Sequence, residues 1–309
     1  MRPRVLIAYD GSSSAKTALR VAAGLFPRAQ ALIATAPQDV SVYVPLAGPG
    51  AMAATPELLR SLVDEAARLA AETAGEAVEL AGELGLQAEA ATVPAFHPVA
   101  AALLDTAHEL EADVLVCGTR GRGRFARALL GSTSSRLLHD TDLPLLVVPE
   151  GGGANDGSVV IAYDGSETAK RAIGVVGRTL GGRSVVIVHA YDHGFDRTLL
   201  HRALGSRPIE EIRLLIDELQ GTMRAKAVEV TEEGVAAARE AGLEATGDTV
   251  PADGSAWRAV AWAARKHGAS LVVVGSRGLG AARSVLLGSV SSGLVQNAEL
   301  PTLVVPARR

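Results

Sequence analysis

The chain has little of several residue types that mark particular classes of protein. Only one of its 309 residues is a cysteine, Cys117, which excludes an intrachain disulfide and fits a reducing compartment. Aromatic residues make up 3% of the chain, so a core built from its 48% hydrophobic residues must be aliphatic. No apolar run reaches the ~18 residues of a membrane span, and the start lacks the pattern of a signal peptide. We therefore expect a cytoplasmic protein without membrane association.

Other chemical signatures are missing as well. The formal net charge of −4 gives no basic field, which argues against a nucleic-acid partner. The seven histidines lack the spacing of a zinc site, so we assign no metal ligand. There is no Walker motif, nucleophile elbow or evident general base, so we assign no catalytic residue. A dinucleotide-like run at 121–126 is a coincidence of letters, because it follows a fourth strand and the second half does not repeat it.

What the chain does contain is one stretch that occurs twice. Each copy has a glycine, two residues, a second glycine, nine residues, and then a third glycine followed by serine. Each copy follows a β-branched run and precedes a segment of helical periodicity. The residues are Gly118, Gly121, Gly131 and Ser132 in the first copy, and Gly275, Gly278, Gly288 and Ser289 in the second.

The physical interpretation of this stretch is anion binding. Gly118 and Gly121 have no Cβ, so they can take positive φ and let the backbone approach a ligand closely. Gly131 and Ser132 stand where a helix begins, and phosphate can accept from its first N–H groups. Serine is also a common N-cap, able to offer its hydroxyl to the helix or to a phosphate oxygen. A single copy would be better explained as an ordinary loop with turn glycines and a helix cap, but two copies with identical spacing reverse that preference and favour a ligand.

The repeat predicts two similar α/β domains, residues 1–150 and 156–309, joined by a glycine-rich linker at 150–157. Strands alternate with helices in each half, which is typical of a doubly wound, five-stranded parallel sheet with helices on both faces. We expect helices at 13–26, 56–84, 98–110, 167–180, 208–241 and 255–267, and second and third strands at 31–35, 86–93, 184–189 and 243–250.

Two local features lead to further expectations. The long helix at 56–84 should bury a face made by Leu58, Leu62, Ala66, Leu69 and Thr73. Each half closes on a similar apolar phrase, at 143–149 and 300–306, whose prolines suit a strand at a sheet edge. An uncovered apolar edge favours aggregation, so we expect the two final strands to meet across a pseudo-twofold axis.

The glycine stretches resemble the phosphate loop of the universal stress protein family, in its ATP-binding branch. Both copies fit that family's pattern without a gap, and the resemblance covers nearly the whole chain. It implies a Rossmann-like fold of the adenine nucleotide alpha hydrolase type that binds ATP with Mg²⁺. It also implies a nucleotide-dependent regulator or sensor in the stress response, with protein partners still to be identified. We expect the tandem chain to form a homodimer.

Asp10 and Asp164 end the first strands of the two halves. Ligands of an open parallel sheet bind where the winding direction switches, here between the first and fourth strands, so each aspartate should face a glycine loop. The resemblance implies that these aspartates contact the adenosine end of the nucleotide. The alternative is an Asp-Gly turn starter. Adenine should lie near Ala34 and Thr35, or near Val188 and His189, although His189 is better explained as a core-edge residue.

Arg120 and Arg277 occupy the same position inside the two loops, where a cation can offset phosphate charge. Further arginines flank them, and a solvated face explains these equally well: Arg122, Arg124, Arg127 and Arg283. The larger number in the first copy suggests that the two sites differ in affinity.

The third helices begin differently from those of similar proteins, which often carry Gly-x-Pro there. This chain has Phe96-His-Pro98 and Asp253-Gly-Ser255, which leaves open the shape of the part of the site that these residues would line next to the nucleotide.

The rival to a regulator is a slow ATPase or a self-phosphorylating enzyme. Its acceptors would be Ser132, Ser134, Ser289 or Ser291. A third interpretation is an interaction protein in which the nucleotide is only a scaffold.

Overall fold

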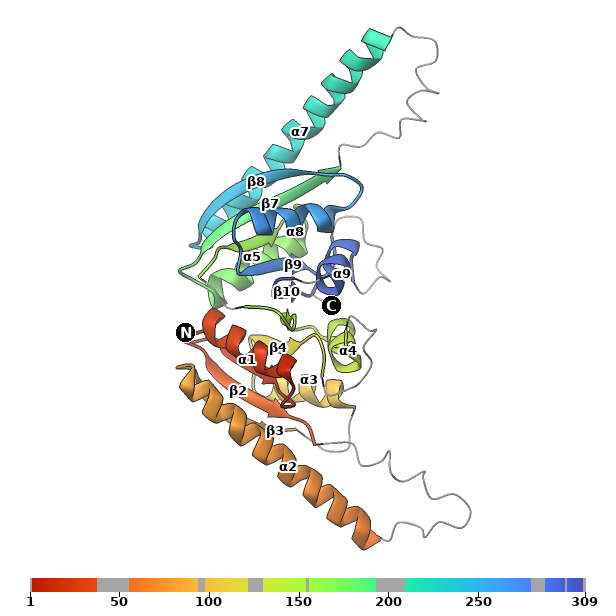
Figure 1. Ribbon diagram of the computed structural model, residues 1–309. Helices are drawn as coiled ribbons and strands as arrows, with labels where there is room; N and C mark the ends of the chain where they lie inside the picture. Colours follow the sequence, from red (N-terminus) through yellow and green to blue (C-terminus); the bar gives the residue numbers. More distant parts are fainter. Residues whose placement is uncertain are drawn as a thin grey trace, which may run out of the picture. The chain divides into compact units, whose positions relative to one another are not determined.

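The computed structural model describes residues 2–37, 56–93, 98–121, 130–153, 156–192, 209–278, 287–297 and 299–307. The chain divides into two compact units, Met1–Asn155 and Asp156–Arg309. Each unit is an α/β domain with a parallel sheet between helices (Figure 1). The predicted fold class is confirmed.

The first unit contains β1 (Arg4–Ala8), α1 (Ser13–Leu25), β2 (Gln30–Thr35), α2 (Pro56–Glu83), β3 (Gln87–Thr92), α3 (Val99–Glu109), β4 (Val114–Gly118), α4 (Ser132–Asp140) and β5 (Leu145–Val148). Its strands lie in the order β3-β2-β1-β4-β5 and all pair in parallel. The order reverses between β1 and β4, so the loops after these strands lie at one edge of the sheet.

The second unit repeats this plan. It contains β6 (Val159–Ala162), α5 (Glu167–Thr179), β7 (Ser184–Asp192), α7 (Ile209–Glu240), β8 (Glu244–Ala252), α8 (Ala256–Lys266), β9 (Leu271–Gly275), α9 (Ser289–Gln296) and β10 (Thr302–Val305). The order β8-β7-β6-β9-β10 is again parallel and reverses between β6 and β9.

The central strands carry continuous apolar runs because helices cover both of their faces. In β1, Val5, Leu6 and Ile7 are at most 1% exposed, as expected for a doubly wound sheet. The following turn places Gly11 at φ +79°, and Ser12 Oγ then accepts from the N–H of Ala15 to cap α1. The Asp-Gly-Ser sequence thus specifies a tight turn and a helix start.

The strands β7 and β8 are longer than the sequence predicted. They pair along their whole length, with Asp192 of β7 opposite Ala252 of β8. Pro251 lies within β8, where the pattern suggested an end. Because β8 is the outer strand of its unit, the missing N–H of proline removes no bond to a further strand.

The buried face of α2 differs from the predicted one. Leu58 and Leu69 are 52% and 48% exposed, and the buried stripe consists of alanines, Ala66, Ala70, Ala74, Ala77 and Ala81. Small side chains let a helix lie close to a sheet, so alanine rather than leucine takes the contact face. The expectation for Leu58 and Leu69 was therefore wrong, while Ala66 is buried as expected.

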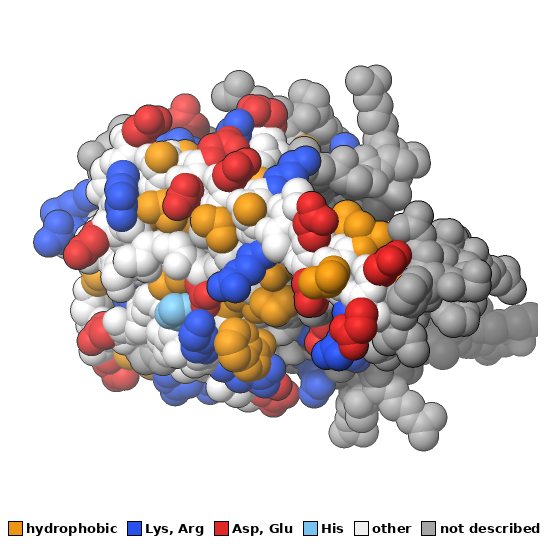
Figure 2. All heavy atoms as spheres, turned by 90° about the horizontal axis from the view of Figure 1, so that it is seen from above, with side chains coloured by type: hydrophobic (Ala, Val, Ile, Leu, Met, Phe, Trp, Pro, Cys, Tyr) orange, Lys and Arg blue, Asp and Glu red, His pale blue; other side chains and the backbone are white. Residues whose placement is uncertain are grey.

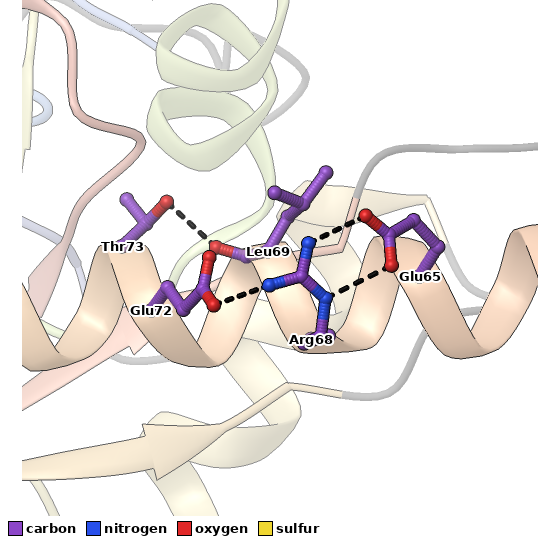
Figure 3. A network of polar contacts seen from close by, with 5 residues as sticks. All are labelled: Glu65, Arg68, Leu69, Glu72 and Thr73. Atoms are coloured by element: carbon purple, nitrogen blue, oxygen red, sulfur yellow. Dashed lines mark hydrogen bonds and ion pairs between the residues drawn. The ribbon is translucent and has the colours of Figure 1, made fainter.

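The outer face of α2 carries a network of charged side chains (Figure 3). Arg68 donates to Glu65 through Nε, 2.9 Å from Oε2, and through Nη2, 2.6 Å from Oε1. It also donates through Nη1 to Glu72, one turn further on. Pairs three and four residues apart stabilise an exposed helix modestly.

A second polar cluster joins the outer strand β8 to the end of α8. Asp248 Oδ2 lies 2.9 Å from Lys266 Nζ and 2.7 Å from His267 Nε2. Burial of Asp248 raises the pKa of its carboxyl, but the hydrogen bonds from Lys266 and His267 outweigh burial and hold the pKa below its usual value. The cluster therefore favours the charged carboxylate in the folded state.

The surface is chemically mixed. In the view of Figure 2, hydrophobic side chains lie interspersed with Lys, Arg, Asp and Glu. Exposed apolar side chains include Leu214 of α7 and Trp262 of α8, at 68% and 52% exposure. Among the described residues, no helix combines the length and the hydrophobicity that crossing a membrane requires.

Candidate functional site

Each aspartate at the end of a first strand uses its two oxygens differently. Asp10 Oδ1 accepts from the N–H of Ser12, and Asp164 Oδ1 accepts from the N–H of Ser166, both at 3.0 Å. The other oxygen, Oδ2, faces the second glycine of the loop. A Cβ built on Gly121 would lie 2.7 Å from Asp10 Oδ2, and one on Gly278 would collide with Asp164 Oδ2. The aspartate is thus a turn starter and also faces the loop.

The loop glycines are required because neighbouring side chains approach their backbone closely, and not because their backbone takes a positive φ. None of Gly118, Gly121, Gly275 and Gly278 has positive φ, so that part of the expectation was wrong. A Cβ on Gly118 would collide with Ser14 Oγ of α1. The first glycine therefore lets a helix pack against the strand end, and the second admits the carboxylate.

The third glycine closes the loop and begins a helix. Gly131 donates to the carbonyl of Thr119 and Gly288 to that of Ser276, both at 2.7 Å. These glycines are the N-caps of α4 and α9, and no side chain caps either helix. Ser132 and Ser289 are the first helical residues and not N-caps, which corrects the sequence prediction. The first amides of each helix have no intrahelical acceptor, as an anion site requires.

Ser134 and Ser291 hold the loop in place, a role that sequence reasoning missed. Ser134 Oγ donates to the carbonyl of Gly118 at 2.9 Å, and Ser291 Oγ to that of Gly288 at 3.0 Å. Both serines are at most 5% exposed. Their repetition in Ser-x-Ser-Ser was the available signal. Because the hydroxyls are buried and already hydrogen-bonded, these two serines are poor candidates for phosphate acceptors.

A cavity of about 600 Å³ in the second unit brings the predicted residues together. Its lining includes every site residue predicted for that half: Asp164, Gly275, Arg277, Gly278, Gly288 and Ser289. The remaining lining is largely apolar and comes from β6, β7, β9, α8, α9 and the residue Leu287 before α9: Ala162, Val188, Ala190, Ala256, Val260, Val274, Leu287 and Val290. The lining therefore combines the donor groups of the loop with apolar side chains.

Val188 and His189, the two residues of β7 that were predicted near adenine, lie on opposite faces of the strand. Val188 and Ala190 line the cavity, whereas His189 between them is not part of its lining. His189 Nδ1 instead lies 2.7 Å from the carbonyl oxygen of Tyr163. This agrees with its explanation as a core-edge residue. Alternate strand residues point to opposite faces, so on β7 Val188 and Ala190 face the cavity and His189 does not.

The first unit places Asp10, Gly121 and Gly131 as the second places their counterparts. Phe96 lies outside the described residues, as do Arg122, Arg124, Arg127 and Arg283. Asp253 is not among the residues that line the cavity of the second unit, where Ala256 and Val260 form the wall from α8.

The two loop arginines have different surroundings. Arg277 lines the cavity, and its Nε is buried without a hydrogen-bond partner in the described part of the chain. Arg120 lies with Nη1 3.4 Å from Oε2 of Glu150. A buried guanidinium N–H without an acceptor is unfavourable, and an anion accepting from Arg277 Nε would remove that cost.

The thiol that precedes the first loop is unreactive. Cys117 precedes the first loop and is buried, and burial raises the pKa of its thiol to about 12, so it stays protonated. Within the described ranges, no three His, Cys, Asp or Glu side chains are grouped to hold a metal ion.

Comparison with known proteins gives consistent matches. The model of the universal stress protein family matches residues 1–149 and again 157–306. A universal stress protein of Mycolicibacterium smegmatis is 31% identical over 262 residues, which are 82% of this chain and 78% of that protein. One of Thermus aquaticus is 35% identical over 150 residues, 48% of this chain and 97% of that protein. Among solved structures, a universal stress protein of Archaeoglobus fulgidus superposes with a TM-score of 0.65 at 19% identity, covering 99% of both chains, a likeness of fold alone.

Proposed function

Because the chain belongs to the universal stress protein family, we propose that it binds ATP in both units and acts as a nucleotide-dependent regulator or sensor in the stress response. One observation carries the proposal: the repeated loop, the strand-end aspartate and the loop arginine of the second unit line one cavity. These residues are far apart in the sequence, and each has a counterpart in the first unit.

The cavity suits the parts of a nucleotide. Its volume of about 600 Å³ lies within the range of ~300–1,000 Å³ typical of small-molecule sites. The apolar wall around Val188, Ala190 and Val260 can hold a base, while the amides that open α9 and the guanidinium of Arg277 can hold phosphates. The carboxylate of Asp164 is an acceptor, so it suits the ribose hydroxyls.

A bound Mg²⁺ would be held through phosphate oxygens and water, the usual arrangement for this ion with nucleotides. It would offset phosphate charge next to the loop. Regulation then requires that ATP bind one conformation, or one partner-bound state, more tightly than another. We also propose that the chain acts as a homodimer, with protein partners that recognise the nucleotide-bound form.

The test is to identify and count the nucleotide that purifies with the protein, by chromatography and mass spectrometry, and then to titrate the nucleotide-free chain with ATP and Mg²⁺. We expect up to two equivalents of ATP per chain and no turnover above uncatalysed hydrolysis. Turnover that is lost in Asp164→Ala and Asp10→Ala would favour the ATPase instead. A folded chain that binds no adenine nucleotide would refute the proposal.

A further inference from the structure

The two units differ in the residue that follows the closing strand. The first has Glu150 after Pro149, and the second has Ala307 after Pro306. Both positions lie beside the loop of their own unit. This is a difference in charge at equivalent places in two otherwise similar sites.

The carboxylate of Glu150 is held by two partners in the first unit. Its Oε2 lies 3.4 Å from Arg120 Nη1, and its Oε1 accepts from Ser13 Oγ at 3.1 Å. Ser13 is the first residue of α1, and Arg120 lies inside the glycine loop. Glu150 therefore links the loop to the helix start with an anion supplied by the chain itself.

The second unit has no such carboxylate at the equivalent position. The N–H of Ala307 donates to Ser276 Oγ at 3.1 Å, which fixes the chain beside the loop. Glu167 replaces Ser13 and pairs with Lys170 of its own helix at 3.7 Å. Arg277 keeps a buried Nε without a partner among the described residues, and it lines the cavity.

We infer that Glu150 competes with phosphate for Arg120, so that the two sites are unequal and the second unit fills first. This inference rests on the proposed function. In the first unit an incoming phosphate must displace the carboxylate from Arg120 and remain near its negative charge. In the second unit it meets a guanidinium with an unused donor. The order is opposite to what a larger number of loop arginines would favour.

The exposure of the Arg120–Glu150 ion pair sets how strongly Glu150 can change ATP affinity in the first unit. The side chains of Arg120 and Glu150 are 45% and 52% exposed, so solvent screens the interaction. Neutralising Glu150 should tighten ATP binding in the first unit by about threefold to tenfold, the range for losing an exposed ion pair and a like-charge repulsion. Salt should reduce the difference between the sites.

The chain provides its own reporter for the second site. Its two tryptophans, Trp257 and Trp262, both lie on α8, which contributes Ala256 and Val260 to the cavity wall. The ring of Trp257 also packs against Gly293 of α9, the helix that begins at the loop. We therefore expect tryptophan fluorescence to report on occupancy of the second unit through α8, while calorimetry counts both sites.

The experiment titrates ATP and Mg²⁺ into the full chain and into two matched variants, Glu150→Gln and Ala307→Glu. We expect the fluorescence change to be complete at the first equivalent. Glu150→Gln should tighten only the second, fluorescence-silent equivalent. Ala307→Glu should weaken the fluorescence-reporting equivalent by a similar factor.

The outcomes separate this inference from the proposed function. The role of Glu150 is overturned if both variants bind two equivalents of ATP with unchanged dissociation constants. It is also overturned if the fluorescence change follows the second equivalent. Either result leaves ATP binding intact. No binding of ATP by the folded chain would overturn both. Circular dichroism of each variant confirms that a change in binding does not come from unfolding.

Discussion

The second glycine of each loop offers the sharpest test of the site. A side chain at Gly278 would collide with Asp164 Oδ2, so Gly278→Val must turn the carboxylate away. Gly278 has no positive φ, so valine strains the site sterically and not through the backbone conformation. Gly121→Val should act in the same way in the first unit, where the Cβ would lie 2.7 Å from Asp10 Oδ2.

The cost to folding should be tolerable. Turning the carboxylate breaks its hydrogen bond with the N–H of Ser166, which contributes about 1 kcal/mol, and overpacking costs about 1–3 kcal/mol. The sum of about 2–4 kcal/mol is below the ~5–15 kcal/mol by which most domains are stable. Gly278→Val should therefore remain folded at room temperature, with a lower melting temperature.

The cost to binding should be larger. The variant loses a charge-assisted hydrogen bond from Asp164 to the ligand, about 1.5–3 kcal/mol, and the close approach of the loop backbone as well. We expect ATP affinity at the second site to fall by about 100-fold or more, a loss equal to about 2.7 kcal/mol. Calorimetric titration of Gly278→Val measures this, with Gly221→Ala as the control, because a Cβ at Gly221 of α7 meets nothing within 4 Å. Wild-type affinity at both sites in a folded Gly278→Val would refute the geometry.

Two further predictions concern stability. A Cβ at Gly234 of α7 would lie 2.8 Å from the ring of Tyr163, so Gly234→Ala should lower the free energy of unfolding by about 1–2 kcal/mol. Gly221→Ala should instead raise the free energy of unfolding by up to about 1 kcal/mol, because alanine has the higher helix propensity. Denaturant titration compares the two variants, and equal effects would contradict the packing of Gly234 against Tyr163. Asp248 has a depressed pKa when folded, so its stabilisation is present above the unfolded pKa of about 4 and is lost as the pH falls through the folded value. Asp248→Asn should therefore unfold with a weaker dependence on pH below about pH 4 than the wild type, and identical acid profiles would exclude the contribution.

Local sequence predicted the helices and strands well, and it singled out residues that lie together in the second unit. Apolar runs and helical periodicity depend on neighbours a few residues apart, so α1 and α5 lie within one residue of their expected bounds. The repeated glycine spacing identified the loops for a similar reason, because it fixes how a strand passes into a helix. The six residues predicted for the second unit all line its cavity.

Contacts between distant segments decided the rest. The buried face of α2 depends on how closely the helix approaches its sheet, which selected alanines over Leu58 and Leu69. The ends of β7 and β8 depend on their pairing with each other, and the need for Gly278 depends on Asp164, far away in the sequence. The sequence by itself determined the order of strands and helices and placed most of the bounds it predicted within a few residues, because those choices are made locally. Only the tertiary structure decided which side chains meet, because packing joins segments whose spacing along the chain carries no local signal.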